Sequence, residues 1–468
     1  MMRRDTRIAG LDLLLRDAEV DGRITRIHIR RGRIAAIGPD LVVPRADVLE
    51  VADCAVIPGL HDHHVHIAAL AAALTSVTVG PPVVHSESEL RSALASAAAV
   101  PRDDGWIRAV GYHESVAGML DRHNIDEMVR GCPVRVQYRT GTMWILNTVA
   151  IERLGLASLQ HPGVERDEQG NPTGRVIGAD DLLRKLGGWG SPNIRRATDL
   201  LLSFGVTGVT DATPFEDNSS AELIEHIRAP APRIVVTGGP SLVYKAGRGP
   251  VKLIVADHAL PSLDAITMGI RAARAQRRAV AVHCVSRIGL LLALAAWEEV
   301  GVLDGDRIEH GGIIDVAMLS QLVDLGLTVV TQPNFIAERG DQYLKDVESD
   351  DLPHLYRCGS LLAAGVRVAG GTDAPFGNPD PWRAMAAAVD RTTSEGVVLG
   401  PQERVTRARA LDLFLGPLHD PGGPRRTLFV GAPADLCVLD AAMGDVLRDL
   451  AACRVCATIV DGRIAYAK

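Results

Sequence analysis

The middle of the chain alternates between short apolar runs and longer stretches with helical periodicity. Helix-like stretches such as "SLDAITMGIRAARAQR" and "VAMLSQLVDLG" separate most of the apolar runs. Apolar strands that alternate with helices are typical of a parallel sheet covered by helices, and eight such units fit a closed (β/α)8 barrel. The runs that we predict to be strands cover residues 61–67, 205–212, 233–238, 251–256, 279–284, 306–312, 326–333 and 365–373.

The two ends of the chain share a sequence pattern that differs from that of the middle. Both contain short strand-like runs punctuated by glycine and aspartate, such as "RITRIHIRRGRIAAIGP" near the start and "ATIVDGRIAY" at the end. Terminal segments of a domain often lie close together. We therefore predict one small β-sandwich domain, built from residues 1–57 plus 424–468, beside a barrel formed by residues 58–423.

The interval between the first and second predicted strands is far longer than one crossover needs. Residues 85–195 include polar, glycine-rich segments such as "QHPGVERDEQGNPTG". A connection of this length is usually a functional insertion. It leaves the carboxyl end of the first strand, so we expect it to lie over the mouth of the barrel as a lid.

Composition narrows the class of protein. A hydrophobic content of 47% and a charged content of 23% are typical of a globular enzyme, and the net charge of −7 offers no basic excess for phosphates. No apolar run is long enough to span a bilayer. The start does not read as a secretion signal, and the seven cysteines are scattered. We expect a cytoplasmic protein that acts on a small molecule and binds neither nucleic acid nor membrane.

The stretch "IPGLHDHHVHI" (57–67) holds four of the 15 histidines. Residues two apart in a strand share a face, so Asp62, His64 and His66 should point one way, and His61 and His63 the other. Two imidazoles on one inward face can chelate zinc or a related divalent ion. Such a pair is a weak signal by itself, because core or surface histidines also produce it.

Three further strand ends strengthen the metal hypothesis. His283 closes "AVAVHC", His310 closes "RIEH" and Asp373 closes "VRVAGGTD". Barrel active sites are built at the carboxyl ends of the strands. Metal-ligand residue types at four strand ends of one chain therefore predict a metal centre.

These motifs resemble the metal-dependent amidohydrolase superfamily. "PGLHDHHVH" and "GGTDAP" carry the likeness, while "VQYRTGTMWILNTVAIERLGL", "NPTG" and "VKLIVAD" resemble the branch that contains N-substituted formamide deformylases. The resemblance implies a distorted (β/α)8 TIM barrel with one or two divalent metals, with zinc expected. It implies that His64 and His66 bind the more buried metal and His283 and His310 the second. It also implies that Asp373 binds metal and takes the proton from the attacking water.

Two-metal members of this superfamily need a bridging anion, which is commonly a carboxylated lysine. Arginine cannot form the carbamate, because it stays protonated. Only Lys185, Lys245 and Lys252 fall between His66 and His283. Lys252 opens the candidate fourth strand and is our predicted bridge, with an ordinary lysine at a strand start as the alternative.

The chain departs from the deformylase branch inside the insertion. Thr142 stands where relatives usually carry histidine, and Gly178 stands where they often carry glutamate. Both changes leave the substrate open. Polar or aromatic residues that could line a pocket, and that could equally serve packing, are Tyr112, His113, Arg139, Trp144 and Asn334.

The predicted function is hydrolysis of a C–N bond in a small molecule, of the amide, cyclic amide or N-substituted formamide type. Metal-activated hydroxide would attack, with Asp373 as general base. One alternative is a mononuclear deaminase, although such enzymes tend to carry glutamate where this chain has Ser286. Another is a barrel that binds a metabolite or performs non-hydrolytic chemistry. A homodimer is left open.

Overall fold

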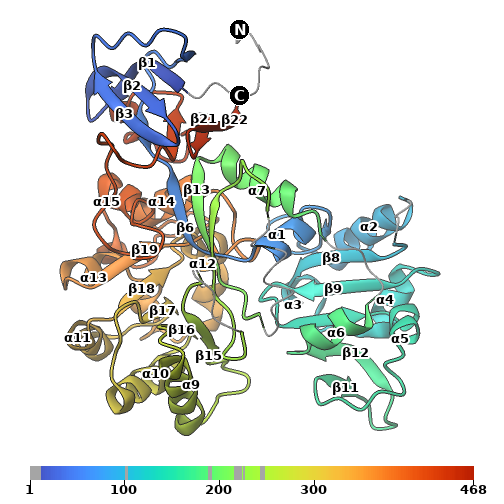
Figure 1. Ribbon diagram of the computed structural model, residues 1–468. Helices are drawn as coiled ribbons and strands as arrows, with labels where there is room; N and C mark the ends of the chain where they lie inside the picture. Colours follow the sequence, from blue (N-terminus) through green and yellow to red (C-terminus); the bar gives the residue numbers. More distant parts are fainter. Residues whose placement is uncertain (1–11, 101–103, 188–191, 216–223, 225–226, 243–247) are drawn as a thin grey trace. The chain divides into compact units, whose positions relative to one another are not determined.

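The computed structural model describes residues 12–100, 104–187, 192–215, 224, 227–242 and 248–468. The chain divides into two compact units, each described by itself (Figure 1). The first joins Met1–Ile67 to Ile194–Lys468, and the second is Ala68–Asn193.

Each of the eight runs that were predicted to be strands contains a strand in the structure. A three-stranded sheet has the order β14-β13-β6, and a five-stranded sheet has the order β15-β16-β17-β18-β19. All pairings within these two sheets are parallel. The strands are β6 (Leu60–Val65), β13 (Val206–Asp211), β14 (Arg233–Val236), β15 (Val251–Ile254), β16 (Val280–Cys284), β17 (Arg307–His310), β18 (Thr328–Thr331) and β19 (Arg367–Gly370).

Backbone hydrogen bonds join the two sheets at both of their edges. Beyond β14, the amide of Lys252 donates to the carbonyl of Gly238 over 2.8 Å. Beyond β19, the amide of Asp373 donates to the carbonyl of His64, also over 2.8 Å, and Val65 forms an isolated parallel bridge with Ala374. These contacts bring the carboxyl ends of the first and last strands together.

Helices accompany the strands and bury apolar faces against them. Helices α7, α9, α10 and α13 contact β13, β15, β16 and β19 in turn. Trp297 and Leu294 on α10 are buried in this way. The helices are α7 (Ile194–Ser203), α9 (Leu263–Ala275), α10 (Arg287–Val300), α11 (Val316–Leu325), α12 (Asn334–Asp346), α13 (Gly359–Ala363), α14 (Pro381–Asp390) and α15 (Arg407–Asp412), with 3₁₀ turns at Leu352–His354 and Pro401–Glu403.

The chain ends form two four-stranded sheets, in the orders β3-β2-β1-β4 and β22-β21-β20-β5. One hydrophobic cluster takes side chains from both, with Ile27 and Ile29 on the first sheet and Val438 and Ile459 on the second. The elements are β1 (Asp12–Val20), β2 (Arg23–Arg30), β3 (Arg33–Gly38), β4 (Asp47–Glu50), β5 (Val56–Pro58), β20 (Leu436–Leu439), α16 (Met443–Val446), β21 (Val455–Val460) and β22 (Arg463–Ala467).

The unit Ala68–Asn193 has its own six-stranded sheet, in the order β11-β12-β10-β9-β8-β7. Separate hydrophobic clusters form around Val136 and Ile145 and around Trp144 and Leu146, so both faces of the sheet are covered. This sheet was not predicted from the sequence. Its elements are β7 (Val77–Thr78), α2 (Glu87–Ala98), β8 (Ile107–Tyr112), α3 (Glu114–Ala117), α4 (Arg122–Met128), β9 (Val134–Tyr138), β10 (Met143–Leu146), α5 (Thr148–Leu154), β11 (Val164–Arg166), β12 (Pro172–Ile177) and α6 (Asp180–Leu186); α1 (Ile67–Ala73) precedes them.

Candidate metal centre

The seam between β6 and β19 brings the first histidine pair next to Asp373. Besides the bond from Asp373 to His64, the amide of His66 donates to the carbonyl of Ala374 over 2.8 Å. The approach is close enough to require glycine at position 371, where an added Cβ would lie 2.5 Å from the Cβ of His64. Backbone packing at this seam therefore fixes where the two ligand-bearing segments meet.

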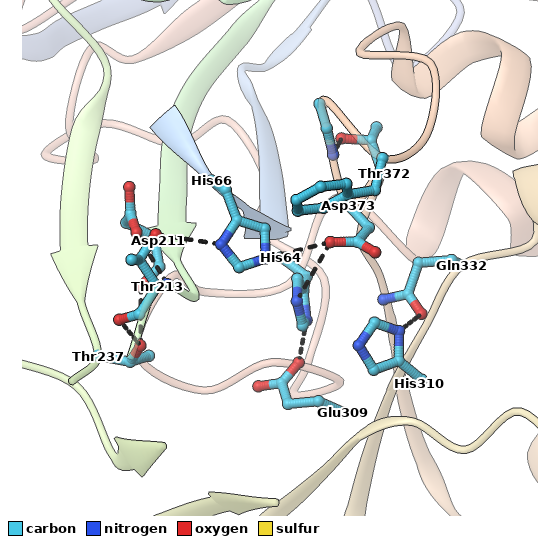
Figure 2. A network of polar contacts seen from close by, with 12 residues as sticks. His64, His66, Asp211, Thr213, Thr237, Glu309, His310, Gln332, Thr372 and Asp373 are labelled. Carbon is cyan, nitrogen blue, oxygen red and sulfur yellow. Dashed lines mark hydrogen bonds and ion pairs between the residues drawn. The ribbon is translucent and has the colours of Figure 1, made fainter. Parts of the chain in front are cut away.

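The predicted ligands of the first strand converge on the carboxylate of Asp373. Its Oδ1 lies 3.5 Å from Nε2 of His64 and 3.3 Å from Nε2 of His66. Figure 2 shows the two imidazoles turned toward this oxygen. One ligand atom from each of His64, His310 and Asp373 falls within 4.8 Å of the others, the spacing of a metal-binding group.

The second predicted pair also comes together. The rings of His283, on β16, and His310, at the end of β17, have centroids 4.4 Å apart, and the His310 ring lies 4.7 Å from that of His64. His310 and Asp373 have φ angles of 74° and 56°, a left-handed backbone that is uncommon outside glycine. Such conformations cluster at functional sites, where the surrounding fold holds them in place.

A shell of acceptors orients the histidines. Nδ1 of His64 lies 2.5 Å from Oε2 of Glu309, and Nδ1 of His310 lies 2.7 Å from Oε1 of Gln332 (Figure 2). Because these oxygens accept hydrogen bonds, each Nδ1 carries the proton and each Nε2 keeps a lone pair for a metal. Glu309 also accepts from Nε of Arg307, and Nδ1 of His66 lies 3.1 Å from Oγ1 of Thr213.

Asp62 holds the same region together without being a ligand. Its carboxylate accepts hydrogen bonds from the amide and hydroxyl of Thr372 and from the amide of His64. Burial raises the pKa of Asp62 to about 6, and the bonds from Thr372 and His64 oppose that rise. Asp62 thus ties β6 to the segment that presents Asp373.

The protonation states of the candidate ligands suit metal binding. Burial lowers the pKa of His64, His283 and His310 well below the usual value, so these imidazoles are neutral. Burial opposes ionisation of Asp373, but the close approach of His66 and the positive charge of Arg339 lower the pKa of Asp373 overall. Nε2 of His64 and Oδ1 of Asp373 are buried with no hydrogen-bond partner. Unsatisfied buried atoms are costly, so this donor set fits a divalent ion.

Lys252 lies on β15 and is buried, and its Nζ has no hydrogen-bond partner. Burial lowers the pKa of Lys252, while Glu309 and Asp373 act in the opposite direction, which places the amine near the ligands. Of the other two lysines of the interval, Lys185 is exposed in the unit Ala68–Asn193, and Lys245 lies outside the described residues.

Four of the five residues predicted to contact substrate lie in one unit of the chain. Tyr112, His113, Arg139 and Trp144 all lie in the unit Ala68–Asn193. The hydroxyl of Tyr112 donates to the carbonyl of Gly118, and the indole of Trp144 donates to Asp180, so these two groups have structural partners within that unit. His113 caps helix α3. Substrate contact by these four residues stays a prediction.

Asn334 stands next to the metal centre, where α12 begins. Its Nδ2 donates to the carbonyl of Thr372 and to Glu338, so it supports the loop that carries Asp373.

The remaining two histidines of the cluster 57–67, His61 and His63, do not face the metal centre in the same way. His61 bonds to the carbonyl of Gly416, and His63 is buried with neither nitrogen bonded. Ser286 caps helix α10 by accepting from the amide of Gly289, so a structural role accounts for it.

The sequence did not identify Glu309, Gln332, Thr213 or Asp62 as supports of the centre. The signal for Glu309 was present, because this buried carboxylate immediately precedes a predicted ligand. The others follow or lie within predicted strands, where nothing in a single sequence separates a supporting polar residue from an incidental one.

Comparison with known proteins agrees with this geometry. The amidohydrolase family profile matches residues 48–466, which is most of the chain. The chain belongs to the amidohydrolase family. It is accordingly a metal-dependent hydrolase of carbon–nitrogen bonds.

Two relatives illustrate the extent of the similarity. The N-substituted formamide deformylase of Arthrobacter pascens is 27% identical, covering 94% of each chain. The crystal structure of an uncharacterized metal-dependent hydrolase from Pyrococcus furiosus is 22% identical with a TM-score of 0.68, over 92% of this chain and 99% of that one. A 5-methylcytosine deaminase from Klebsiella pneumoniae shares the fold at 16% identity, with a TM-score of 0.54 over 98% of each chain. In the described ranges, no helix of this amidohydrolase is long and apolar enough to cross a membrane.

Proposed function

We propose that this amidohydrolase cleaves the amide bond of a small N-substituted amide, with formamides as the first class to test. The observation that carries the proposal is the convergence of His64, His310 and Asp373 on one buried point. The similarity to an N-substituted formamide deformylase over 94% of both chains supports the choice of substrate class.

His64 and His66, together with Asp373, would hold one divalent ion, and His283 and His310 would hold a second. Zinc suits imidazole and carboxylate donors at such a site. A bound divalent ion would supply Lewis acidity and bring the pKa of a water molecule toward neutrality. We infer one or two ions for each chain.

Asp373 is the group that moves the proton. Its lowered pKa keeps the carboxylate ionised, so Oδ1 can accept a proton from the attacking water. The water oxygen forms a bond to the amide carbon while the C–N bond breaks. Asp373 then gives the proton to the leaving nitrogen, and a carboxylic acid and an amine result.

Lys252 is our candidate for the carboxylated bridge. Carbamate formation requires a neutral amine, and burial without a hydrogen-bond partner favours that form. The position of Lys252 at the start of β15, with Glu309 and Asp373 as electrostatic neighbours, supports this role. An unmodified lysine at a single-metal site is the competing interpretation.

We further propose that the eight parallel strands close into a distorted barrel and that the two terminal sheets form a β-sandwich. The hydrogen bonds at both sheet edges and the shared apolar cluster support these assignments. A role as a lid for Ala68–Asn193, a cytoplasmic location and a homodimer stay predictions.

Metal content and turnover test the function together. The protein would be prepared without chelator, beside a Lys252→Ala variant, and its metals counted by mass spectrometry. We expect about two ions per chain, with one or none in the variant. One ion in both proteins would remove Lys252 from the centre, and no ion in either would overturn the proposal. His283→Ala should reduce hydrolysis of N-benzylformamide roughly 1000-fold, since metal assistance contributes several kcal/mol.

A further inference from the structure

Helix α12 carries an arginine toward the metal centre. Arg339 donates through Nη2 to the carbonyl of Phe376. The ring of Phe376 packs edge-on against His66 with centroids 5.3 Å apart, and its amide donates to the carbonyl of Asp373 over 2.8 Å. Arg339 is therefore separated from two metal-ligand residues by a single residue that contacts both.

The guanidinium of Arg339 is fixed in place but mostly unbonded. Its Cζ lies 3.8 Å from the ring centroid of Phe335, in cation–π contact. Arginine has five N–H donors, and the bond to Phe376 is the one that Arg339 makes among the described residues. No carboxylate in the described part of the chain forms an ion pair with it. Arg339 is only partly buried, so its remaining donors can reach a ligand.

The nearest acidic neighbour on the helix is engaged elsewhere. Glu338 accepts from the amide of Asn378 through both of its oxygens, at 3.0 and 3.2 Å, and from Nδ2 of Asn334. The sequence therefore places a carboxylate beside Arg339 without pairing the two. No ion pair among the described residues takes up the positive charge of Arg339, which acts on Asp373 and Glu338 at longer range.

Two tyrosines complete the surroundings. The hydroxyls of Tyr343 and Tyr356 lie 3.4 Å apart and share a hydrogen bond. Burial raises the pKa of Tyr356 well above its usual value, and the nearby charge of Arg339 opposes the rise. Tyr356 stays a neutral donor close to the guanidinium, and the ring of Phe335 packs edge-on against it at 5.5 Å.

We propose that Arg339 forms an anion-recognition subsite of this enzyme, with Tyr356 as a second donor, and that the amide substrate carries a carboxylate. A planar guanidinium matches a carboxylate in bidentate geometry, and stacking on Phe335 holds the fork in advance. The inference rests on the proposed function, because it assigns the substrate class of the same centre. The competing role is purely structural, in which Arg339 only clamps the carbonyl of Phe376.

Binding of benzoate and its neutral analogue benzamide tests the subsite without turnover. Affinities would be measured by calorimetry for the metal-loaded enzyme, for Arg339→Met and for Arg383→Met, which removes an exposed arginine from α14. We expect Arg339→Met to weaken benzoate roughly 10- to 100-fold, the value of a charge-assisted hydrogen bond, and benzamide by less than about threefold. Arg383→Met should bind benzoate as the wild type does.

A carboxylate could also bind the metal directly, and the variants separate the two modes. Benzoate affinity that is equal in the wild type and in Arg339→Met would overturn the subsite, as would the absence of benzoate binding by the wild type. Arg339→Lys keeps the charge but loses the fork, and we expect an intermediate affinity. Metal content and melting temperature would show that each variant is folded and loaded.

Turnover of a matched pair separates this inference from the proposed function. N-formylphenylalanine and its carboxamide differ in the negative charge, and kcat/KM would be compared for both. We expect the wild type to prefer the acid at least tenfold, and Arg339→Met to lose that preference. Cleavage of both compounds without preference, unaffected by the variant, would sink the subsite and leave the hydrolase intact. Failure to cleave either, with benzoate binding still dependent on Arg339, would sink the formamide assignment and leave the subsite intact.

Discussion

The two ends of strand β17 present opposite kinds of polar cluster. At its amino end, Asp306 is buried and accepts from Nη1 and Nη2 of Arg274, the indole of Trp297 and the amides of Val280 and Leu303. At its carboxyl end, Glu309 and His310 support a centre in which Nε2 of His64 and Oδ1 of Asp373 have no hydrogen-bond partner.

This difference separates stability from chemistry within one strand. A buried network whose donors and acceptors are all matched lowers the free energy of the folded state and offers nothing to a ligand. A buried network with unmatched donor atoms costs stability unless a ligand completes it. Enzymes built from parallel strands and helices place their chemistry at the carboxyl ends of the strands, and β17 follows that division.

The largest effect on stability should come from the amino end. Asp306→Ala leaves the buried donors of Arg274, Trp297 and two amides without an acceptor. We expect a loss of about 3–5 kcal/mol in the free energy of unfolding, measured by denaturant titration. Activity per folded, metal-loaded molecule should stay near the wild-type value.

Asp304→Ala is the matched control, two residues away. The side chain of Asp304 is 96% exposed, and its contact with Arg367 spans 3.6 Å. A surface pair of this kind contributes little, so stability should hardly change. Equal destabilisation by the two substitutions would contradict the assignment of a structural cluster to this end of the strand.

The sequence predicted the core strands and the histidines and aspartate that come together at their carboxyl ends, because both depend on local pattern. The apolar runs that end in His283, His310 and Asp373 are strands in the structure, and their carboxyl ends meet because parallel strands align. The pair His64 and His66 followed from strand alternation. The six-stranded sheet of Ala68–Asn193 was missed, because its short strands are interrupted by glycine and polar turns.

Which supporting residue pairs with which ligand was not visible in the sequence, for a different reason. Glu309 and His64 are 245 positions apart, and only the folded backbone brings them to 2.5 Å. The same holds for Asp62 and Thr372, which are 310 positions apart. Long-range pairs of this kind depend on sheet register, which a single sequence does not encode in any local motif.

An intermediate effect should come from the carboxyl end. Glu309→Gln keeps the volume but replaces a charged acceptor of His64 with a neutral one. We expect metal affinity to fall roughly 10- to 100-fold, the usual effect of losing a carboxylate behind a ligand histidine. Competition with a chromophoric chelator measures this affinity directly, without reference to turnover.

Glu403→Gln is a matched control for that change. Glu403 is also a fully buried carboxylate, paired with Arg357 over 2.8 Å and with Ser360, and it has no contact with the metal ligands. The Glu403→Gln variant should be less stable than the wild type and keep the wild-type metal affinity. A fall in affinity that is as large in Glu403→Gln as in Glu309→Gln would mean that general loosening of the fold, and not support of His64, controls the metal.

The smallest expected effect on stability comes from His63. This residue sharpens the comparison of the two ends of β17, because it lacks hydrogen-bond partners and yet is not a predicted metal ligand. Both of its nitrogens are buried with no partner, yet the metal-binding group in the described part of the chain is His64, His310 and Asp373. Burial, with Arg307 and Arg426 nearby, lowers the pKa of His63 to about 3. An unsatisfied atom therefore marks a functional site only where other ligands converge on it.

The pH dependence of the free energy of unfolding should show the effect of His63. Its pKa is about 3 in the folded state and about 6.5 in the unfolded state, so between these values the unfolded chain binds the extra proton. Stability from this residue is complete above pH 6.5 and falls as the pH drops toward 3. From pH 7 to pH 5.5 the loss amounts to about 1 kcal/mol. His63→Gln does not titrate, so its free energy of unfolding should fall less than that of the wild type over this range, by about that amount. Parallel pH profiles for the two proteins would show that His63 has the same pKa in the folded and unfolded states, and would contradict this prediction.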